Sequence, residues 1–318
     1  MLSDLSAVKI KENVYWVGAI DWNVRNFHGY TTDRGTTYNA YLVIDEKITL
    51  FDTVKKGFGT ELLERVASVI DPSDIDYIVS NHAEPDHSGE LSHVMEKVSP
   101  EKVFASKMGV KALTEHYPEL EGRVEPVENE GILSLGEKSV KFMETKMIHW
   151  PDSMFSYLVE DALLISQDAF GMHLASGERF DDMLPSENLF NHAAGYYANI
   201  VTLYSPQISR LLKKVEEMDL KIDIIAPDHG PVWRKSDNIA EIISLYKQWS
   251  SRKISPKLVV FYDTMWHSTE KMARYIEDAA LSSGIKVVSI SLSSSDRSEI
   301  ATEMLDAAAV AVGSPTMN

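Results

Sequence analysis

The sequence contains no cysteine, and this absence excludes several kinds of site at once. Without thiols the chain cannot form disulfides, bind zinc or an iron–sulfur cluster through thiolates, or use a cysteine nucleophile. An apolar run of about 20 residues, the length that crosses a bilayer as a helix, is also missing. The N-terminus lacks the basic and apolar segments of a signal peptide. We therefore expect a cytoplasmic protein that does not enter a membrane.

Basic residues are scarce relative to acidic ones. Lysine and arginine number 31 against 48 aspartates and glutamates, which gives a formal net charge of −17. Such a surface repels nucleic acid and anionic lipid, so neither is expected as a partner. The 318 residues, 44% hydrophobic and 25% charged, are typical of a globular protein and sufficient for two domains.

The pattern of apolar residues predicts a first domain over residues 1–252. "VYWVGAI", "TTYNAYLVI" and "ITLFDT" have the β-branched and aromatic composition of strands. From residue 60 to 116 helices and strands alternate, and strands return between 124 and 168. Residues 186–218 read as helix interrupted at Pro206, and a buried strand "IDIIAP" precedes the helix "NIAEIISLYKQW".

A second domain is expected over residues 256–318, after the polar linker "SSRKISPK". The strands "LVVFYD", "KVVSISL" and "AAVAVGS" alternate with helices, which is the order of a doubly wound parallel sheet. With only three strands before residue 318, we expect this domain to be incomplete in the sequence.

The segment "NHAEPDHSGE" at residues 81–90 combines two histidines with three acids directly after the apolar run "DYIVS". If the segment is extended, His82, Glu84 and Asp86 point the same way, and His87 joins them as a helix begins. Carboxylates beside a buried strand need a neutralising partner. A metal ion would serve, and the alternative is a salt-bridged surface loop.

Three later strand ends each carry one more residue of the ligand type. These are His149 in "MIHWPDS", Asp168 in "ISQDAFG" and His229 in "APDHGP". Strand ends meet at the edge of a sheet, so the seven side chains together predict a metal centre. Two imidazoles and two carboxylates in the first segment alone exceed what one tetrahedral zinc needs.

The strand order and these seven residues resemble the metallo-β-lactamase fold, an αβ/βα sandwich. Zinc hydrolases of that fold typically have a histidine where this chain has Glu84, and a carboxylate–histidine set suits iron better. The His-x-Glu-x-Asp-His form, followed by a flavodoxin-like domain, resembles the flavodiiron proteins. Within that family the segment "AIDWNVRNFHGYTTDRGTTYNAYLV" is most similar to the coenzyme F-420H2 oxidases of methanogens.

The resemblance implies which side chains bind two irons per subunit. One iron would be held by His82, Glu84 and His149, the other by Asp86, His87 and His229, with Asp168 bridging them. It also implies that His28, with Tyr196 or Tyr197, lines the oxygen pocket and donates protons or hydrogen bonds. The alternatives are a loop histidine and tyrosines that only pack. His93, His116, His173, His192 and His267 have no ligand partners in sequence and are expected to be structural or surface residues.

A second cofactor, FMN, is implied by two loops of the second domain. "YDTMWHSTEKMA" places hydroxyls and backbone amides at a helix N-terminus, which suits a phosphate monoester. It resembles the flavodoxin phosphate loop, although an ordinary helix N-cap reads similarly. "GSPTMN" resembles the next flavin loop. The FMN contacts implied by the two loops are Thr264, His267, Ser268 and Thr269, then Ser314, Pro315, Thr316 and Asn318.

The function implied by the resemblance is an oxidoreductase that reduces O2 to water. Reduced coenzyme F-420 would reduce FMN, and FMN would reduce the di-iron site of the other subunit in a homodimer, with a tetramer as the alternative assembly. One alternative is the same scaffold supplied by rubredoxin or reducing nitric oxide. Two others are a zinc hydrolase of the metallo-β-lactamase fold and an FMN electron shuttle with an inactive first domain.

Overall fold

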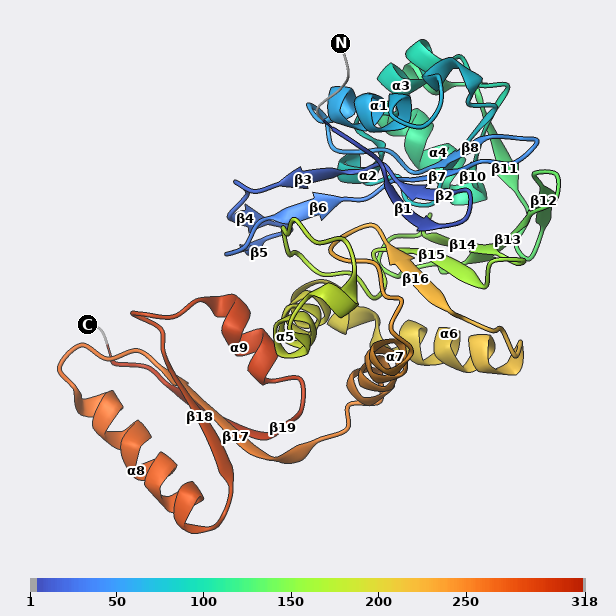
Figure 1. Cartoon of the computed structure of the whole chain (residues 1–318). Helices are drawn as coiled ribbons and strands as arrows, with labels where there is room; N and C mark the ends of the chain where they lie inside the picture. The colour runs from blue at the N-terminus through green and yellow to red at the C-terminus, as the bar shows by residue number, and fades with distance from the viewer. Residues whose placement is uncertain (1–4, 317–318) are drawn as a thin grey trace.

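A computed structural model describes residues 5–316, in which two sheets pack face to face and a third sheet lies to one side (Figure 1). The first sheet has the order β1-β2-β7-β8-β9-β10-β11. Its strands are β1 Val8–Lys11, β2 Val14–Trp16, β7 Tyr41–Val43, β8 Thr49–Phe51, β9 Tyr77–Ser80, β10 Lys102–Ser106 and β11 Val124–Val127. Pairing is antiparallel from β1 to β8 and parallel from β8 to β11.

The second sheet has the order β12-β13-β14-β15-β16 and is antiparallel except for the parallel pair β15 and β16. Its strands are β12 Ile132–Ser134, β13 Ser139–Glu144, β14 Met154–Leu158, β15 Leu163–Gln167 and β16 Ile224–Pro227. One apolar cluster joins the facing sides of the two sheets, with Trp16 and Phe51 from the first and Phe142 and Ile165 from the second. Strands covered on both faces are mostly apolar, and every residue of β14 and β15 is buried.

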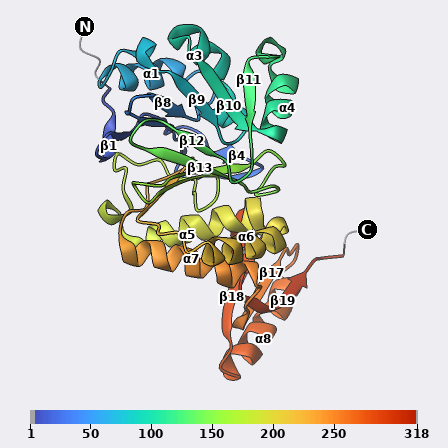
Figure 2. The same ribbon diagram turned by 90° about the vertical axis from the view of Figure 1, so that its right-hand side faces the viewer.

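Helices cover the outer face of each sheet (Figures 1 and 2). Over the first sheet lie α1 Gly59–Ala67, α3 Leu91–Val98 and α4 Lys107–His116, and over the second α5 Ser186–Tyr196, α6 Ser205–Glu217 and α7 Ser236–Ser250. Each helix buries an apolar stripe, such as Leu62 and Val66 of α1, against its sheet. The predicted αβ/βα sandwich is therefore confirmed. Short helices, α2 Pro85–Ser88 and the 3-10 turns Pro72–Asp74, Pro118–Leu120 and Asp181–Met183, lie in the connections.

The helical stretch from 186 is interrupted, but not at Pro206 as predicted. After α5 the chain forms a π-helix, η4 Tyr197–Val201, and a 3-10 turn, η5 Thr202–Tyr204, before α6 begins at Ser205. Pro206 lies in the first turn of α6, where its missing N–H costs no helical hydrogen bond. The break precedes the proline, which starts the next helix.

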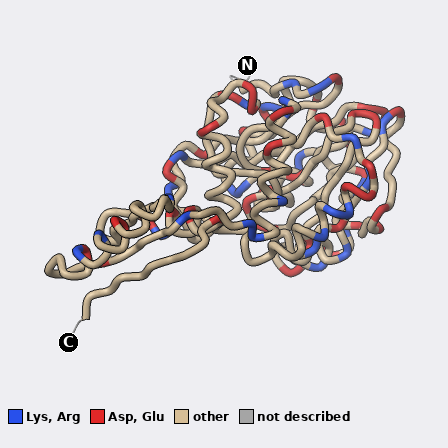
Figure 3. The backbone as a smooth tube through the Cα atoms, turned by 90° about the horizontal axis from the view of Figure 1, so that it is seen from below, with Lys and Arg blue, Asp and Glu red and all other residues tan. Residues whose placement is uncertain are grey.

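The third sheet is parallel, with the order β18-β17-β19. Its elements are β17 Ser255–Tyr262, α8 Ser268–Ser282, β18 Lys286–Ser291, α9 Arg297–Glu303 and β19 Ala307–Gly313. Helix α9 packs between this sheet and the sandwich, where Asn199 Nδ2 donates to the carbonyl of Ser298 at 3.3 Å. Among residues 5–316, no helix is long and apolar enough to cross a bilayer. Acidic and basic residues are interspersed along the sandwich part of the chain (Figure 3).

Candidate metal centre

The predicted ligands gather at one end of the sandwich, where parallel strands of both sheets finish. His82 follows β9, Asp168 follows β15 and His229 follows β16, while His149 comes from the connection between β13 and β14. Two short hairpins lie beside them, β3 Ala19–Asp21 with β6 Thr36–Tyr38, and β4 Asn26–Phe27 with β5 Tyr30–Thr31. Parallel pairing brings the carboxyl ends of β9 and β10, and of β15 and β16, to the same edge of their sheets.

The predicted ligands divide into two sets, and His28 forms two further groups, one with Glu84 and Asp86 and one with His173 and His229. The first set, His82, Glu84, His149 and Asp168, has its ligand atoms within 4.8 Å of one another. The second set, Asp86, His87 and His229, meets the same limit.

Asp168 belongs to the first ligand set and also faces the second. Its Oδ2 is 3.3 Å from Nε2 of His82 and 3.1 Å from Nε2 of His149. Its Oδ1 is 3.3 Å from Nε2 of His87 and 3.5 Å from Nε2 of His229. Each oxygen therefore faces one set, which is the geometry of a carboxylate that bridges two cations.

The local backbone differs from the extended segment that we predicted. Glu84 is extended, but Pro85 begins the one-turn helix α2, so Asp86 and His87 reach the site from a helical turn. Proline at the first helical position is preorganised for that conformation and loses no hydrogen bond there. The turn brings Asp86 to His87 and His229, whereas Glu84 lies with His82 and His149; His28 is within reach of both carboxylates.

The buried atoms of the site lack partners in a way that fits two metal ions. Both carboxylate oxygens of Asp86 and Asp168, and Nε2 of His87, His149 and His229, are buried without a hydrogen-bond partner. Unpaired buried carboxylates are unfavourable unless a cation neutralises them. Histidine nitrogens with carboxylate oxygens form a donor set that suits iron. The residues present therefore fit a di-iron site.

Hydrogen bonds on the far side of the imidazoles direct them into the site. The Nδ1–H of His82 donates to Asp152 Oδ2 at 2.9 Å, and the same oxygen accepts the backbone N–H of Ala83 at 2.6 Å. The Nδ1–H of His229 donates to the carbonyl of Thr37 at 2.6 Å. With Nδ1 protonated, both rings present a bare Nε2, as metal ligands require.

The electrostatics of the cluster strengthen this interpretation. Burial raises the pKa of Glu84, but the imidazoles of His149, His28 and His82 outweigh burial and hold that pKa well below the usual value. Burial lowers the pKa of His87, yet Asp86 and Asp228 raise it to about 10. Glu84 is therefore ionised, whereas His87 holds a proton that it must release when a metal binds, so metal affinity falls as the pH is lowered.

Of the three residues expected to line the oxygen pocket, His28 and Tyr196 lie beside the predicted ligands and Tyr197 does not. His28 lies in the turn between β4 and β5, with Nε2 3.2 Å from Glu84 Oε1 and 3.7 Å from Asp86 Oδ2. Tyr196 is fully buried, its hydroxyl has no partner, and its ring centroid is 6.0 Å from that of His229. Tyr197 instead bonds Ser205 at 2.9 Å and packs on α7. The expectation of a site role is therefore corrected for Tyr197.

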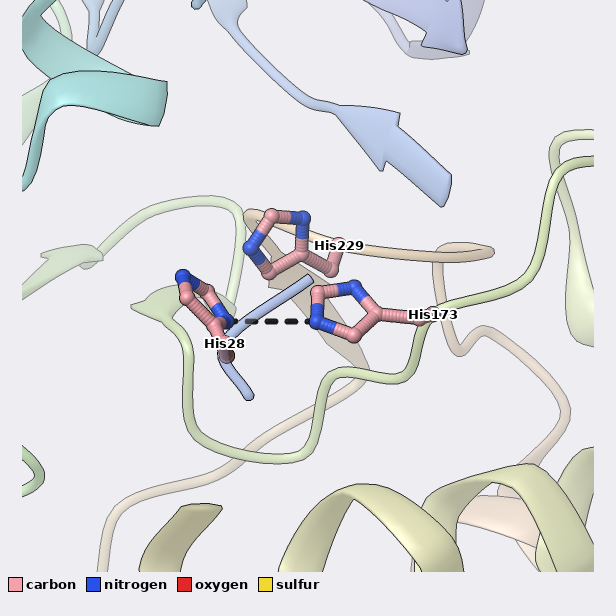
Figure 4. Close-up of side chains that lie close together, drawn as sticks. All are labelled: His28, His173 and His229. Atoms are coloured by element: carbon pink, nitrogen blue, oxygen red, sulfur yellow. Dashed lines mark hydrogen bonds between the residues drawn. The ribbon is translucent and has the colours of Figure 1, made fainter. Parts of the chain in front are cut away.

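His173 was expected to be a structural or surface residue, and the structure places it in the cluster instead. Its Nε2 is 3.2 Å from Nδ1 of His28, and its ring centroid is 4.6 Å from that of His229 (Figure 4). Its position five residues after Asp168, in the loop that leaves β15, was the available signal. His93 is exposed on α3, as expected.

The two expected FMN loops lie side by side at the carboxyl ends of the strands of the third sheet. Tyr262 at the end of β17 pairs with Gly313 at the end of β19, and a Cβ on Gly313 would be 2.6 Å from Thr269 Cγ2. The first turn of α8 has no side-chain cap, and Thr264 Oγ1 is buried without a partner. Free amides and a free hydroxyl at a helix N-terminus fit a phosphate group.

Most of the predicted FMN contacts lie at the two loops, but one of them is largely exposed and another lies outside the described residues. Ser268 and Thr269 begin α8, and Ser314, Pro315 and Thr316 follow β19. The side chain of His267 is 84% exposed and bonds Glu270 at 2.8 Å. Asn318 lies outside the described residues.

Comparison with known proteins shows what this combination of domains is similar to. The model of the "ODP family beta lactamase" matches residues 36–230, more than half of the chain, and the flavodoxin model matches residues 260–318. Rubredoxin-oxygen oxidoreductase of Megalodesulfovibrio gigas is 45% identical, over 99% of this chain and 78% of that protein. Nitric oxide reductase of Moorella thermoacetica is 44% identical, over 98% and 78%. Coenzyme F420H(2) oxidase of Methanothermobacter marburgensis is 40% identical, over 98% and 78%.

Solved structures agree with these sequence matches. The rubredoxin oxygen:oxidoreductase of Desulfovibrio gigas superposes with a TM-score of 0.95 at 46% identity, over 98% of this chain and 78% of that one. The flavodiiron protein of Giardia intestinalis superposes with a TM-score of 0.94 at 35% identity, over 99% and 76%.

Fold, site and relatives together define an oxidoreductase in which a metallo-β-lactamase-like domain with a dinuclear metal centre precedes a flavodoxin domain. The chain belongs to the flavodiiron protein family. The cofactors of this family are FMN in the flavodoxin part and a di-iron site in the lactamase-like part.

Proposed function

We propose that the two ligand sets hold two irons and reduce O2 to water. One iron would be bound by His82, Glu84 and His149, and the other by Asp86, His87 and His229, with Asp168 between them. The single observation that carries this proposal is Asp168, whose two buried oxygens have no hydrogen-bond partner and each lie close to the histidines of one set. Two irons would together supply two electrons at a time to one O2 molecule, which redox-inactive zinc does not.

The protein's own side chains would hold and protonate the substrate. The hydroxyl of Tyr196 is buried without a hydrogen-bond partner and its ring lies beside His229, while His28 lies beside both Glu84 and Asp86, so both side chains adjoin the ligand sets. Each would donate a hydrogen bond to a reduced oxygen atom there. The buried surroundings limit the access of bulk water, which strengthens these hydrogen bonds.

We propose FMN as the entry point for electrons, bound by the loops after β17 and β19, and reduced coenzyme F-420 as its donor. The support for this donor is the coenzyme F420H(2) oxidase, 40% identical over nearly the whole chain. Rubredoxin is the second candidate donor, supported by the relative at 45% identity. Nitric oxide is the second candidate substrate, supported by the relative at 44%.

Two further points belong to the same proposal. Residues 1–252 would form the di-iron domain and residues 256–318 the start of the FMN domain, because α7 ends at Ser250 and β17 begins at Ser255. A head-to-tail homodimer would bring the FMN of one subunit to the di-iron site of the other.

The experiment that tests this function is elemental analysis of the chain, followed by turnover. We expect about two irons per chain, as in two-metal sites, and consumption of O2 when reduced F-420 is supplied. Glu84→Gln should lose iron and O2 consumption, whereas the exposed Glu96→Gln should keep both. Tightly bound zinc with no reduction of O2 or nitric oxide by either donor would overturn the proposal and favour hydrolysis.

A further inference from the structure

A pocket of about 250 Å³ lies beside the loop that leads to His149. It is formed where α6 faces the end of β13 and the connection from β13 to β14. Thr145 and Ile148 line it from that connection, and the carbonyl of Thr145 accepts the backbone N–H of Ile148 at 3.0 Å. The described residues that line the pocket include none of the seven predicted metal ligands, so it is a separate feature of the surface.

The charge of this pocket is positive, although the chain as a whole carries a net charge of −17. Its lining includes Lys146 from the loop and Arg210 and Lys214 from α6. Nζ of Lys146 pairs with Glu144 at 2.7 Å, and Nζ of Lys214 pairs with Glu130 at 2.6 Å. In the described part of the chain, the guanidinium of Arg210 has neither an ion-pair nor a hydrogen-bond partner. One positive charge is therefore unbalanced, and it attracts an anion to this position.

Two buried polar atoms of the same lining residues also lack partners. Thr145 is 3% exposed, and its Oγ1 is buried without a hydrogen-bond partner. A buried hydroxyl in that state is unfavourable, so a ligand oxygen that accepts its hydrogen bond would stabilise the site. Oε1 of Gln207 is buried and unpartnered as well, and an amide oxygen requires a donor. The two atoms together fit a ligand that both accepts and donates hydrogen bonds.

A phosphate group has the properties that these atoms require. Its oxygens accept charge-assisted hydrogen bonds from a guanidinium and from a hydroxyl. At neutral pH inorganic phosphate also keeps an O–H, which a sulfate ion or a carboxylate lacks, and this O–H can donate to an amide oxygen. We propose that the pocket binds a phosphate group, with Arg210 and Thr145 as donors and Gln207 as the acceptor. The site lies outside the metal centre and does not depend on the proposed function.

The test is calorimetric titration of the full chain with inorganic phosphate, after the chain has been loaded with FMN and iron so that the flavin loop and the metal centre are occupied. Arg210→Gln should raise the Kd for phosphate about tenfold or more, because it removes a charge-assisted hydrogen bond. Thr145→Val keeps the shape of the side chain without the hydroxyl and should raise the Kd about twofold to tenfold. Lys213→Gln is the matched control on α6, since Lys213 is 77% exposed, pairs with Glu217 and does not line the pocket, so the Kd should stay the same.

Two further ligands identify the source of the phosphate group. Tighter binding of methyl phosphate than of inorganic phosphate would assign the pocket to a phosphate ester, and the reverse order would assign it to the inorganic ion. Sulfate should bind more weakly than phosphate, and equal affinity for the two would overturn the proposal, because the pocket would not select phosphate. Absence of phosphate binding, or the same Kd in wild type and Arg210→Gln, would also overturn it. Both variants should fold, because Arg210 is exposed and the hydroxyl of Thr145 has no partner to lose.

Discussion

At the scale of single residues, the metal centre depends on side chains that never touch the metal. Asp152 is buried behind His82 and accepts from both its Nδ1–H and the backbone N–H of Ala83. Thr37 serves His229 in the same way through its carbonyl. These acceptors select the tautomer and the direction of each ligand, so they influence metal affinity as strongly as some of the ligands do.

Asp152→Ala should therefore weaken iron binding by about 10-fold to 100-fold, because His82 loses the acceptor that fixes its tautomer. The measurement is an iron titration of the metal-free protein, followed by its absorption. Asp161→Asn is the matched control, since Asp161 is equally buried but pairs with Lys138, away from the site. Equal iron affinities for the two variants would contradict the role given to Asp152.

At the scale of elements, the helix α2 decides how one short motif serves two ligand sets. The helix is only one turn long, and its position depends on Gly89, which follows it. A Cβ at Gly89 would lie 2.3 Å from the carbonyl of Pro85 and 2.8 Å from the backbone nitrogen of Lys56. Both contacts are with backbone, so neither can move aside easily.

Gly89→Ala should destabilise the protein by about 1–3 kcal/mol, the usual cost of overpacking. It should also reduce iron content, because Asp86 and His87 move with α2. Thermal unfolding and elemental analysis measure the two effects. Gly177→Ala is the matched control: a Cβ there meets nothing within 4 Å, so we expect its stability to change by less than about 0.5 kcal/mol. A stable, fully loaded Gly89→Ala protein would show that α2 has room to shift.

At the scale of the whole molecule, the third sheet is joined to the sandwich through the start of α9. Asp296 accepts the backbone N–H of Ser298 as the helix N-cap and the hydroxyl of Thr31 from β5. Thr31 in turn donates its N–H to Ser298 Oγ at 3.1 Å. The cap of α9 is therefore also a contact between the third sheet and the sandwich. Its partner on the sandwich, Thr31, lies three residues after His28.

Asp296→Ala should cost about 1 kcal/mol of stability near neutral pH, the usual value of an N-cap. Hydrogen bonds from Ser298 and Thr31 hold the pKa of Asp296 below its ordinary value. Its contribution is therefore present above a pH of about 4, the pKa of an unfolded aspartate, and disappears as the pH falls through the lower folded value.

The measurement is the difference in unfolding free energy between wild type and Asp296→Ala as a function of pH. The difference should shrink below pH about 4. Asp278→Ala, an exposed aspartate on α8 that caps no helix, should show a small difference at every pH. A difference for Asp296→Ala that grows on acidification would have the wrong sign for a stabilising carboxylate.

Much of this protein was predictable from its sequence, for reasons that are local. The mostly apolar strands β14 and β15 and the apolar stripe of α1 follow from the patterns of buried strands and amphipathic helices. The ligand types at His82, Glu84, Asp86 and His87 can be recognised in the sequence because metal binding requires imidazole and carboxylate side chains. The resemblance of the sequence to the flavodiiron family, which the comparisons confirm, rests on the same motifs.

Only the tertiary structure decided how distant residues combine. A sequence does not show that a helical turn at Pro85 assigns Asp86 to a different set from Glu84, or that α6 begins before Pro206. Nor does it show that Tyr196 faces His173 while Tyr197, one residue later, bonds Ser205. His173 itself gains its partners from Thr36 and His28, more than 130 residues earlier in the chain. Local pattern determines which elements form, whereas hydrogen bonds between buried side chains depend on where the packed sheets bring them together.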